Sequence, residues 1–216
     1  MPKYTTIIFD MDGVVVDTEK VYMKADFEFL KRHGTAYKLE EIKDLLVGRE
    51  IKEGTRVLKE KYNFTGDLET LYGERKSLLD QSFQNNIGFI PGFLDFYRQI
   101  KELGFKTCIA TSSNDDFLKM IDQKLGLFKL FENKVFGISK VENKSKPDPA
   151  IFLFAAKETG SLPEECVVIE DSPRGIEAAK RANMFCVGLG TTFETQKIAN
   201  ADIVVKSYGE IDIKIL

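Results

Sequence analysis

The chain has 216 residues, of which 43% are hydrophobic and 30% are charged, and its 31 basic and 34 acidic residues give a net charge of -3. This balance is typical of a soluble globular protein and argues against a membrane protein or a disordered tail. The basic residues form no block, which argues against a nucleic-acid partner, because affinity for the phosphate backbone depends on clustered Lys and Arg. Small molecules are therefore the expected partners.

Short apolar runs alternate with helical patterns along most of the chain. Most of the runs are continuous, which is typical of strands covered on both faces. The predicted strands span residues 5–9, 107–110, 134–138, 166–169, 185–189 and 203–205. The helices predicted with them span residues 93–103, 116–125, 149–159 and 173–182. Two of these helices begin with a capping side chain before a proline, at Asp148 and Ser172. This alternation predicts an α/β fold with a doubly wound parallel sheet.

The stretch between the first two strands carries only helical patterns. Its apolar positions have helical spacing over residues 21–31, 42–46, 55–61 and 68–83. A crossover between parallel strands needs only about a dozen residues, so this stretch is long enough for a separate domain. We therefore predict an α/β core of residues 1–17 and 91–216 with an inserted all-helical domain of residues 18–90.

The cysteines and the amino terminus bear on the compartment. Cys108, Cys166 and Cys186 lie inside predicted strands and are expected to be reduced and buried. The amino terminus shows no secretory apolar stretch, and the apolar runs are far shorter than the roughly 20 residues that a membrane crossing needs. We expect a cytoplasmic protein without a membrane partner; a monomer is compatible with the sequence, which does not set an oligomeric state.

Reactive side chains gather where the predicted strands end and in the loop before residue 149. They are Asp10, Asp12, Thr111, Ser112, Ser113, Lys146, Glu170 and Asp171. The carboxyl ends of parallel strands meet at one edge of a sheet, where ligands bind. Carboxylates without His or Cys suit Mg²⁺, and residues 111–114 at a predicted helix start offer N–H groups to an anion. A metal ion beside an anion site indicates a phosphorylated ligand.

Other hydrolytic and nucleotide-binding sites are disfavoured. His33 is the only histidine and lies in the predicted insertion, which argues against Ser-His-Asp and Cys-His hydrolases and excludes multi-histidine metal sites. The chain has no GxxxxGK[ST] loop. Residues 188–193 begin like a dinucleotide-binding fingerprint but lack its third glycine, so we interpret them as a turn.

Four segments resemble, in order, the motifs of the haloacid dehalogenase superfamily, specifically its phosphatase and β-phosphoglucomutase-like branch. They are DMDGVVVDT at residues 10–18, IATSSN at 109–114, KSKPDP at 144–149 and VIEDSPRGIEAA at 168–179. Each motif alone is a weak signal, but four in the expected strand contexts are a strong one. The resemblance implies a Rossmann-like core with a helical cap domain.

The resemblance also implies roles for these residues. Asp10 would attack phosphorus to give an aspartyl phosphate, while Asp12 would protonate the leaving oxygen and then deprotonate the hydrolytic water. Mg²⁺ would be held by the side chains of Asp10, Glu170 and Asp171 and by the backbone carbonyl of Asp12. The remaining phosphate oxygens would be held by Thr111, Ser112, Ser113 and Lys146. We expect a Mg²⁺-dependent phosphatase of a small phosphorylated metabolite, with a sugar phosphate as the expected substrate.

Two alternatives stay open. In the mutase subgroup of the family the cap supplies a histidine where this chain has Tyr22 and a lysine where it has Val47. Both differences argue against a mutase, whereas Glu19 and Arg49 resemble residues of sugar-phosphate phosphatases and could contact the substrate. A non-catalytic module that binds a phosphorylated ligand is the second alternative, and it would be expected to lack Asp10 or Asp12.

Overall fold

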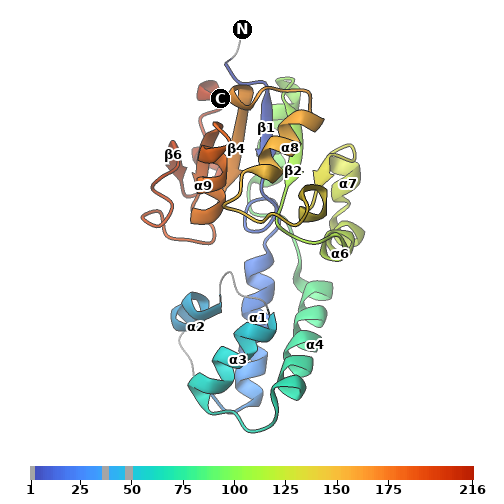
Figure 1. The fold of residues 1–216 in the computed structure, drawn as a ribbon, viewed down its shortest axis with the longest axis vertical. Coiled ribbons are helices and arrows are strands. Elements are labelled where there is room, and N and C mark those ends of the chain that lie inside the picture. The colour runs from blue at the N-terminus through green and yellow to red at the C-terminus, as the bar shows by residue number, and fades with distance from the viewer. Residues whose placement is uncertain (1–2, 36–38, 47–50) are drawn as a thin grey trace. The chain divides into compact units, whose positions relative to one another are not determined.

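The computed structural model of the chain describes residues 3–35, 39–46 and 51–216 (Figure 1). The chain forms two compact units, one of Met1–Asp17 with Gly88–Leu216 and one of Thr18–Ile87. The sequence-based division placed the second boundary slightly later, after residue 90. Roles of the two units as core and cap remain a prediction.

The first unit contains a six-stranded sheet in which all neighbouring strands are parallel. Its strands are β1 Thr6–Phe9, β2 Lys106–Ala110, β3 Val135–Phe136, β4 Cys166–Glu170, β5 Phe185–Leu189 and β6 Ile203–Val205. The order β3-β2-β1-β4-β5-β6 places β1 between β2 and β4. This is a doubly wound sheet, as the sequence predicts, and the change of direction beside β1 is where such folds bind ligands.

Helices cover both faces of this sheet. They are α5 Phe93–Glu102, α6 Asp115–Leu125, α7 Leu127–Leu130, α8 Ala150–Glu158 and α9 Pro173–Arg181, with short 3₁₀ helices at Ile138–Val141, Pro163–Glu165, Tyr208–Glu210 and Ile213–Ile215. The ring of Phe9 contacts that of Phe93 in α5, with centroids 5.6 Å apart. Ile8 belongs to a buried cluster with Phe152 of α8. Successive residues of a strand point to opposite faces, so α5 and α8 cover opposite sides of β1.

The predicted strand at residues 134–138 is wrong in its second half. β3 ends at Phe136, and a 3₁₀ helix begins at Ile138. The Ile138 amide donates to the carbonyl oxygen of Ser113, which lies outside the β ladder, at 3.2 Å. A β-carbon on Gly137 would lie 2.9 Å from the same oxygen. The missing side chain of Gly137 thus lets the chain turn towards the segment after β2.

The second unit is built from helices. They are α1 Thr18–Arg32, α2 Leu39–Leu46, α3 Ile51–Tyr62 and α4 Leu68–Asn86. Each contains one of the predicted helical segments. The helix α4 begins after Asp67, whose carboxylate accepts a hydrogen bond from the amide of Thr70 at 2.9 Å, which is a favourable N-cap.

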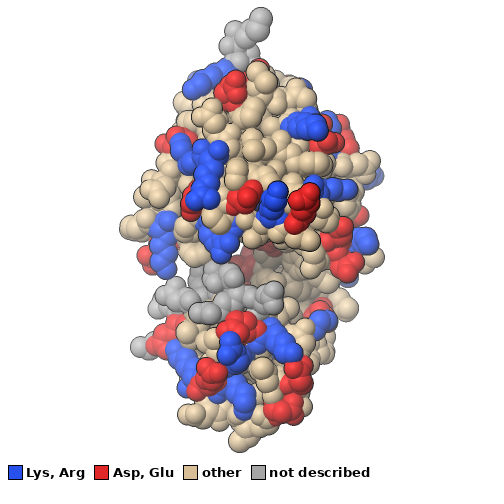
Figure 2. Space-filling view, in the orientation of Figure 1, with Lys and Arg blue, Asp and Glu red and all other residues tan. Residues whose placement is uncertain are grey.

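Charged side chains of both signs are mixed on the surface, as they are mixed along the sequence (Figure 2). Figure 2 shows basic and acidic side chains interspersed on the drawn face of each unit. Cys108, Cys166 and Cys186 are buried and free of disulfides. Within the part of the chain that the structure describes, no helix has both the length and the apolar character needed to cross a membrane.

A buried ion pair joins three helices of the second unit. Arg75 of α4 donates from Nε to Asp26 Oδ1 of α1 at 2.7 Å and from Nη1 to the carbonyl oxygen of Ile51 in α3 at 2.9 Å. Arg75 is 3% exposed and Asp26 is 5% exposed. Removing one partner of such a pair leaves a buried charge without its counter-charge, which is strongly destabilising.

We therefore expect Arg75→Met to lower the free energy of unfolding by about 3–5 kcal/mol. The control is Arg98→Met, because Arg98 pairs with Asp95 on the surface, where the side chains are 68% and 74% exposed. A surface pair contributes at most about 1 kcal/mol. Urea unfolding followed by circular dichroism measures both variants, and similar losses in the two would contradict the importance of the buried pair.

Candidate active site

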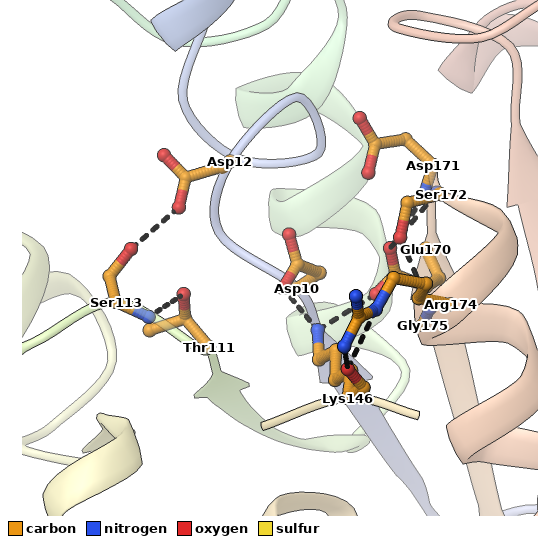
Figure 3. A network of polar contacts seen from close by, with 10 residues as sticks. All are labelled: Asp10, Asp12, Thr111, Ser113, Lys146, Glu170, Asp171, Ser172, Arg174 and Gly175. Carbon is orange, nitrogen blue, oxygen red and sulfur yellow. Dashed lines mark hydrogen bonds and ion pairs between the residues drawn. The ribbon is translucent and has the colours of Figure 1, made fainter. Parts of the chain in front are cut away.

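Three neighbouring strands bring the predicted site residues to one edge of the sheet. Asp10 follows β1, Thr111 follows β2, and Glu170 is the last residue of β4. β1 pairs with both of the other strands, in registers that match Phe9 with Ile109 and Ile169. The side chains that follow these matched positions must therefore lie near one another, as Figure 3 shows.

The loop after β1 is held by its own backbone. The carbonyl oxygen of Met11 accepts hydrogen bonds from the amides of Val15 and Val16, each at 2.9 Å. Gly13 has a φ of 74°, and a β-carbon there would lie 2.0 Å from Asp171 Oδ2. Glycine is thus required at this position, because the loop passes directly over the Asp171 carboxylate.

The ammonium group of Lys146 lies between two buried carboxylates. Its Nζ donates to Asp10 Oδ1 and, at 2.8 Å, to Glu170 Oε2. Burial alone would lower the pKa of this lysine, but the charges of Asp10 and Glu170 raise the pKa above its ordinary value. Lys146 is therefore a fixed cation beside the expected nucleophile.

The Glu170 carboxylate is fixed by the start of α9. Its Oε1 accepts hydrogen bonds from the amide of Asp171 at 3.1 Å and from the amide and hydroxyl of Ser172 at 3.0 and 2.8 Å. The Ser172 hydroxyl oxygen also accepts from the amide of Gly175, which makes Ser172 the predicted N-cap. A β-carbon on Gly175 would lie 1.9 Å from the Glu170 carboxylate. Glycine leaves the space that this carboxylate fills.

Asp10, Glu170 and Asp171 form a buried acidic group. Each has a carboxylate oxygen within 4.8 Å of the others. Burial raises the pKa of Asp10 to about 8, against the effect of Lys146, and the charges of Glu170 and Asp12 add to the rise. Burial and the charges of Glu170 and Asp10 raise the pKa of Asp171 well above its usual range. Three carboxylates face one ammonium group, so a divalent cation would balance the charge, and these oxygen donors fit Mg²⁺.

The Asp12 carboxylate is not part of this acidic group and in Figure 3 points towards Ser113. The Ser113 hydroxyl donates a hydrogen bond to Asp12 Oδ2 at 2.8 Å, and the Ser113 amide donates to Thr111 Oγ1 at 3.1 Å (Figure 3). Thr111 is buried and Ser112 is exposed. The residue that caps α6 is Asn114, which accepts from the amide of Phe117 at 2.9 Å. Residues 111–113 therefore precede the helix, and phosphate binding by Thr111, Ser112 and Ser113 stays a prediction.

Glu19 and Arg49 are the two residues of the helical insertion that were predicted to contact the substrate, and the structure describes only the first. Glu19 lies in the first turn of α1. Arg49 lies outside the described residues, as does Val47. Their contact with a substrate stays a prediction.

Two contacts of the site were missed by the sequence reasoning. Arg174 donates from Nε and Nη2 to the carbonyl oxygen of Lys146, at 2.9 and 2.5 Å. Ser113 contacts Asp12 although 101 positions separate them. Arg174 could have been suspected from its place in the segment after Glu170 and Asp171, but its partner is a backbone atom, which leaves no signal in the sequence.

Known proteins match this chain over the region that contains the site. A model of the haloacid dehalogenase-like hydrolases matches residues 4–183, which include the whole acidic group, Lys146 and Asp12. The chain is 35% identical over 186 residues to the "Probable pseudouridine-5'-phosphatase" of Drosophila melanogaster, covering 84% of this chain and 80% of the relative. It is 33% identical over 182 residues to the "Phosphorylated carbohydrates phosphatase" of Thermotoga maritima, with coverages of 82% and 81%. The "Beta-phosphoglucomutase" of Bacillus subtilis is 30% identical over 226 aligned residues, with coverages of 97% and 92%.

The fit between Gly175 and Glu170 gives a test of the site's packing. We expect Gly175→Ala to lower the free energy of unfolding by about 1–3 kcal/mol, because the new methyl group would displace the Glu170 carboxylate. The control is Gly73→Ala in α4, where a β-carbon would meet nothing within 4 Å. Alanine favours helices, so that variant should gain up to about 1 kcal/mol. Denaturant unfolding measures both, and an undiminished stability of Gly175→Ala would contradict the packing argument.

Proposed function

The chain belongs to the family of haloacid dehalogenase-like hydrolases and is a phosphatase of phosphorylated small molecules, and we propose that it works through a covalent aspartyl phosphate on Asp10. The observation that supports this proposal most directly is the buried Asp10 carboxylate, held by the Lys146 ammonium group beside two further acids. A carboxylate nucleophile divides one difficult displacement into two easier steps.

In the first step an oxygen of Asp10 forms a bond to phosphorus while the bond from phosphorus to the substrate oxygen breaks. Asp12 donates a proton to that oxygen, so the alcohol leaves neutral. A carboxylate and a phosphate oxygen repel each other by about 4 kcal/mol per pair of unit charges at ~4 Å and an effective dielectric constant of ~20. Lys146 offsets part of this repulsion because its ammonium group is already in contact with Asp10.

In the second step a water molecule attacks the phosphorus of the aspartyl phosphate. Asp12, now a carboxylate, accepts the proton from this water. The bond between phosphorus and the Asp10 oxygen breaks, which releases inorganic phosphate and restores the Asp10 carboxylate. The Asp12 carboxyl group thus serves both half-reactions. It can do so because it lies only two residues from the proposed nucleophile.

The acidic group would hold Mg²⁺ through the side chains of Asp10, Glu170 and Asp171, with the backbone carbonyl of Asp12 as a further ligand. A bound Mg²⁺ would neutralise charge on the phosphoryl oxygens. Thr111, the amide of Ser112 and Lys146 would bind the oxygens that remain. Thr111 and Ser112 follow β2, the neighbour of β1, and Lys146 contacts Asp10 from the loop before α8, which supports a common role in binding one phosphoryl group.

The proposed substrate is a small phosphorylated metabolite, and a sugar phosphate is the first choice. The relative named for phosphorylated carbohydrates supports this choice. Glu19 and Arg49 are the residues proposed to contact the polar end of the substrate. A panel of phosphorylated metabolites, assayed for released phosphate, identifies the preferred compound.

A phosphosugar mutase is the second candidate, because one relative carries that name. A mutase transfers the phosphoryl group back to a sugar and releases little inorganic phosphate. Tyr22 argues against it, since the mutase subgroup has a histidine at that position; in the structure the Tyr22 ring contacts Phe83, with centroids 5.5 Å apart. Continuous release of inorganic phosphate from the preferred substrate supports the phosphatase, and its absence supports the mutase.

We expect Asp10→Asn to reduce hydrolysis of p-nitrophenyl phosphate by about a thousandfold or more, since the amide is not a nucleophile. Circular dichroism should show an intact fold. Asp95→Asn is the matched control, because Asp95 is an exposed carboxylate of α5 whose only part in the argument is its surface pair with Arg98. Turnover retained in Asp10→Asn would remove Asp10 as the nucleophile.

Excess EDTA should stop turnover of p-nitrophenyl phosphate, and added Mg²⁺ should restore it. The physical reason is the surplus of buried negative charge that repels a phosphate dianion when no divalent cation is bound. The measurement is the initial rate before chelation, after chelation and after Mg²⁺ is returned. An unchanged rate in EDTA would refute the metal assignment.

A further inference from the structure

The hydrogen bond between Ser113 and Asp12 joins two loops that come from different strands. Ser113 Oγ is the donor and Asp12 Oδ2 the acceptor, at 2.8 Å. Asp12 follows β1 and Ser113 follows β2, so their closeness depends on the pairing of these two strands. In Figure 3 the Asp12 carboxylate points towards Ser113, whereas Asp10 points towards Lys146.

The backbone of Ser113 is fixed from several sides. Its amide donates to Thr111 Oγ1 at 3.1 Å, and its carbonyl oxygen accepts from the amide of Ile138 at 3.2 Å. Gly137 makes the second contact possible, because a β-carbon there would lie 2.9 Å from that oxygen. The next residue, Asn114, caps α6. The Ser113 hydroxyl is therefore presented from a rigid base.

We propose that Ser113 is a positioning residue that orients the Asp12 carboxyl group for proton transfer; this inference rests on the proposed function. A carboxylic acid that accepts the serine hydroxyl at Oδ2 carries its own proton on Oδ1. As the bond from Asp10 to phosphorus forms and the bond to the leaving oxygen breaks, that oxygen receives the proton from Asp12 Oδ1. The Ser113 hydroxyl keeps its hydrogen throughout and changes no covalent bond.

This role differs from the phosphate contact expected from the sequence. A serine hydroxyl has one hydrogen to donate, and here that hydrogen is given to Asp12. A phosphate oxygen would have to compete for it.

The test uses the acidity of the leaving group. Nitrophenol leaves readily as an anion and needs little protonation, whereas an alkyl alcohol leaves poorly unless it is protonated. We expect Ser113→Ala to lower kcat/KM for 4-nitrobenzyl phosphate by about tenfold, the effect of one lost hydrogen bond. For p-nitrophenyl phosphate the loss should be below about threefold. The ratio kcat/KM reports the steps up to departure of the alcohol, so hydrolysis of the aspartyl phosphate does not mask the effect.

Two further variants show whether Ser113 acts through Asp12. Ser113→Thr keeps the hydroxyl and should restore most of the activity towards 4-nitrobenzyl phosphate. In an Asp12→Asn background, Ser113→Ala should cause no further selective loss, because the group that it orients is gone. The control is Ser139→Ala, since Ser139 also donates to an aspartate, Asp115 Oδ1 at 2.7 Å, but is exposed and outside the site. It should leave both rates unchanged.

The outcomes separate this inference from the proposed function. Equal losses on the two substrates in Ser113→Ala, or no loss on either, would overturn the positioning role. So would an additional selective loss in the Asp12→Asn background. Turnover retained in Asp10→Asn would instead overturn the aspartyl-phosphate mechanism itself, whatever the Ser113 variants show.

Discussion

Lys146 contacts Asp10 and Glu170 with its ammonium group, and all three side chains are buried. Burying a charge is costly unless an opposite charge compensates for it, so each member of this group depends on the others. The compensation is incomplete, because Asp171 adds a third carboxylate. The surplus of negative charge therefore favours a cation near the carboxylates. In the proposed mechanism a metal ion supplies this positive charge, which lets a phosphoryl group approach Asp10 beside Lys146.

The start of α9 keeps this charge arrangement in place. Ser172 binds the Glu170 carboxylate and caps the helix with the same hydroxyl group. Gly175 leaves space for that carboxylate, and Arg174 holds the backbone of Lys146 through two hydrogen bonds to one carbonyl oxygen. One helical turn thus fixes both partners of an ion pair whose members are 24 residues apart. Rigid placement matters because a charge can stabilise a transition state only if it need not move to do so.

The sequence predicted the sheet and the closeness of three acids at its edge because both depend on local patterns. Continuous apolar runs predicted the strands, and the acids at their ends predicted the acidic group of Asp10, Glu170 and Asp171. The failures have a common cause. β3 is shorter than its apolar pattern because Gly137 packs against a distant carbonyl group, and the contact between Ser113 and Asp12 depends on the register of two strands. Such contacts are set by tertiary structure and leave no periodicity to detect.

The proposed mechanism gives two identical side chains, Asp10 and Asp12, different chemistry. They are two residues apart on a loop that is anchored by the buried Met11 between them. Burial raises the pKa of Asp10, and the charge of the Lys146 ammonium group, from which Asp10 accepts a hydrogen bond, opposes this larger effect by lowering the pKa, whereas Asp12 accepts a hydrogen bond from the Ser113 hydroxyl group. A nucleophile must be ionised when it attacks, while a group that acts as acid and then as base must change its protonation state within each cycle. The Ser113 hydroxyl group can stay hydrogen-bonded to Asp12 through that change, because it can donate to a carboxylic acid and to a carboxylate alike. The proposed division of roles thus agrees with the different partners that the segment after β2 and the loop of Lys146 bring to one short loop.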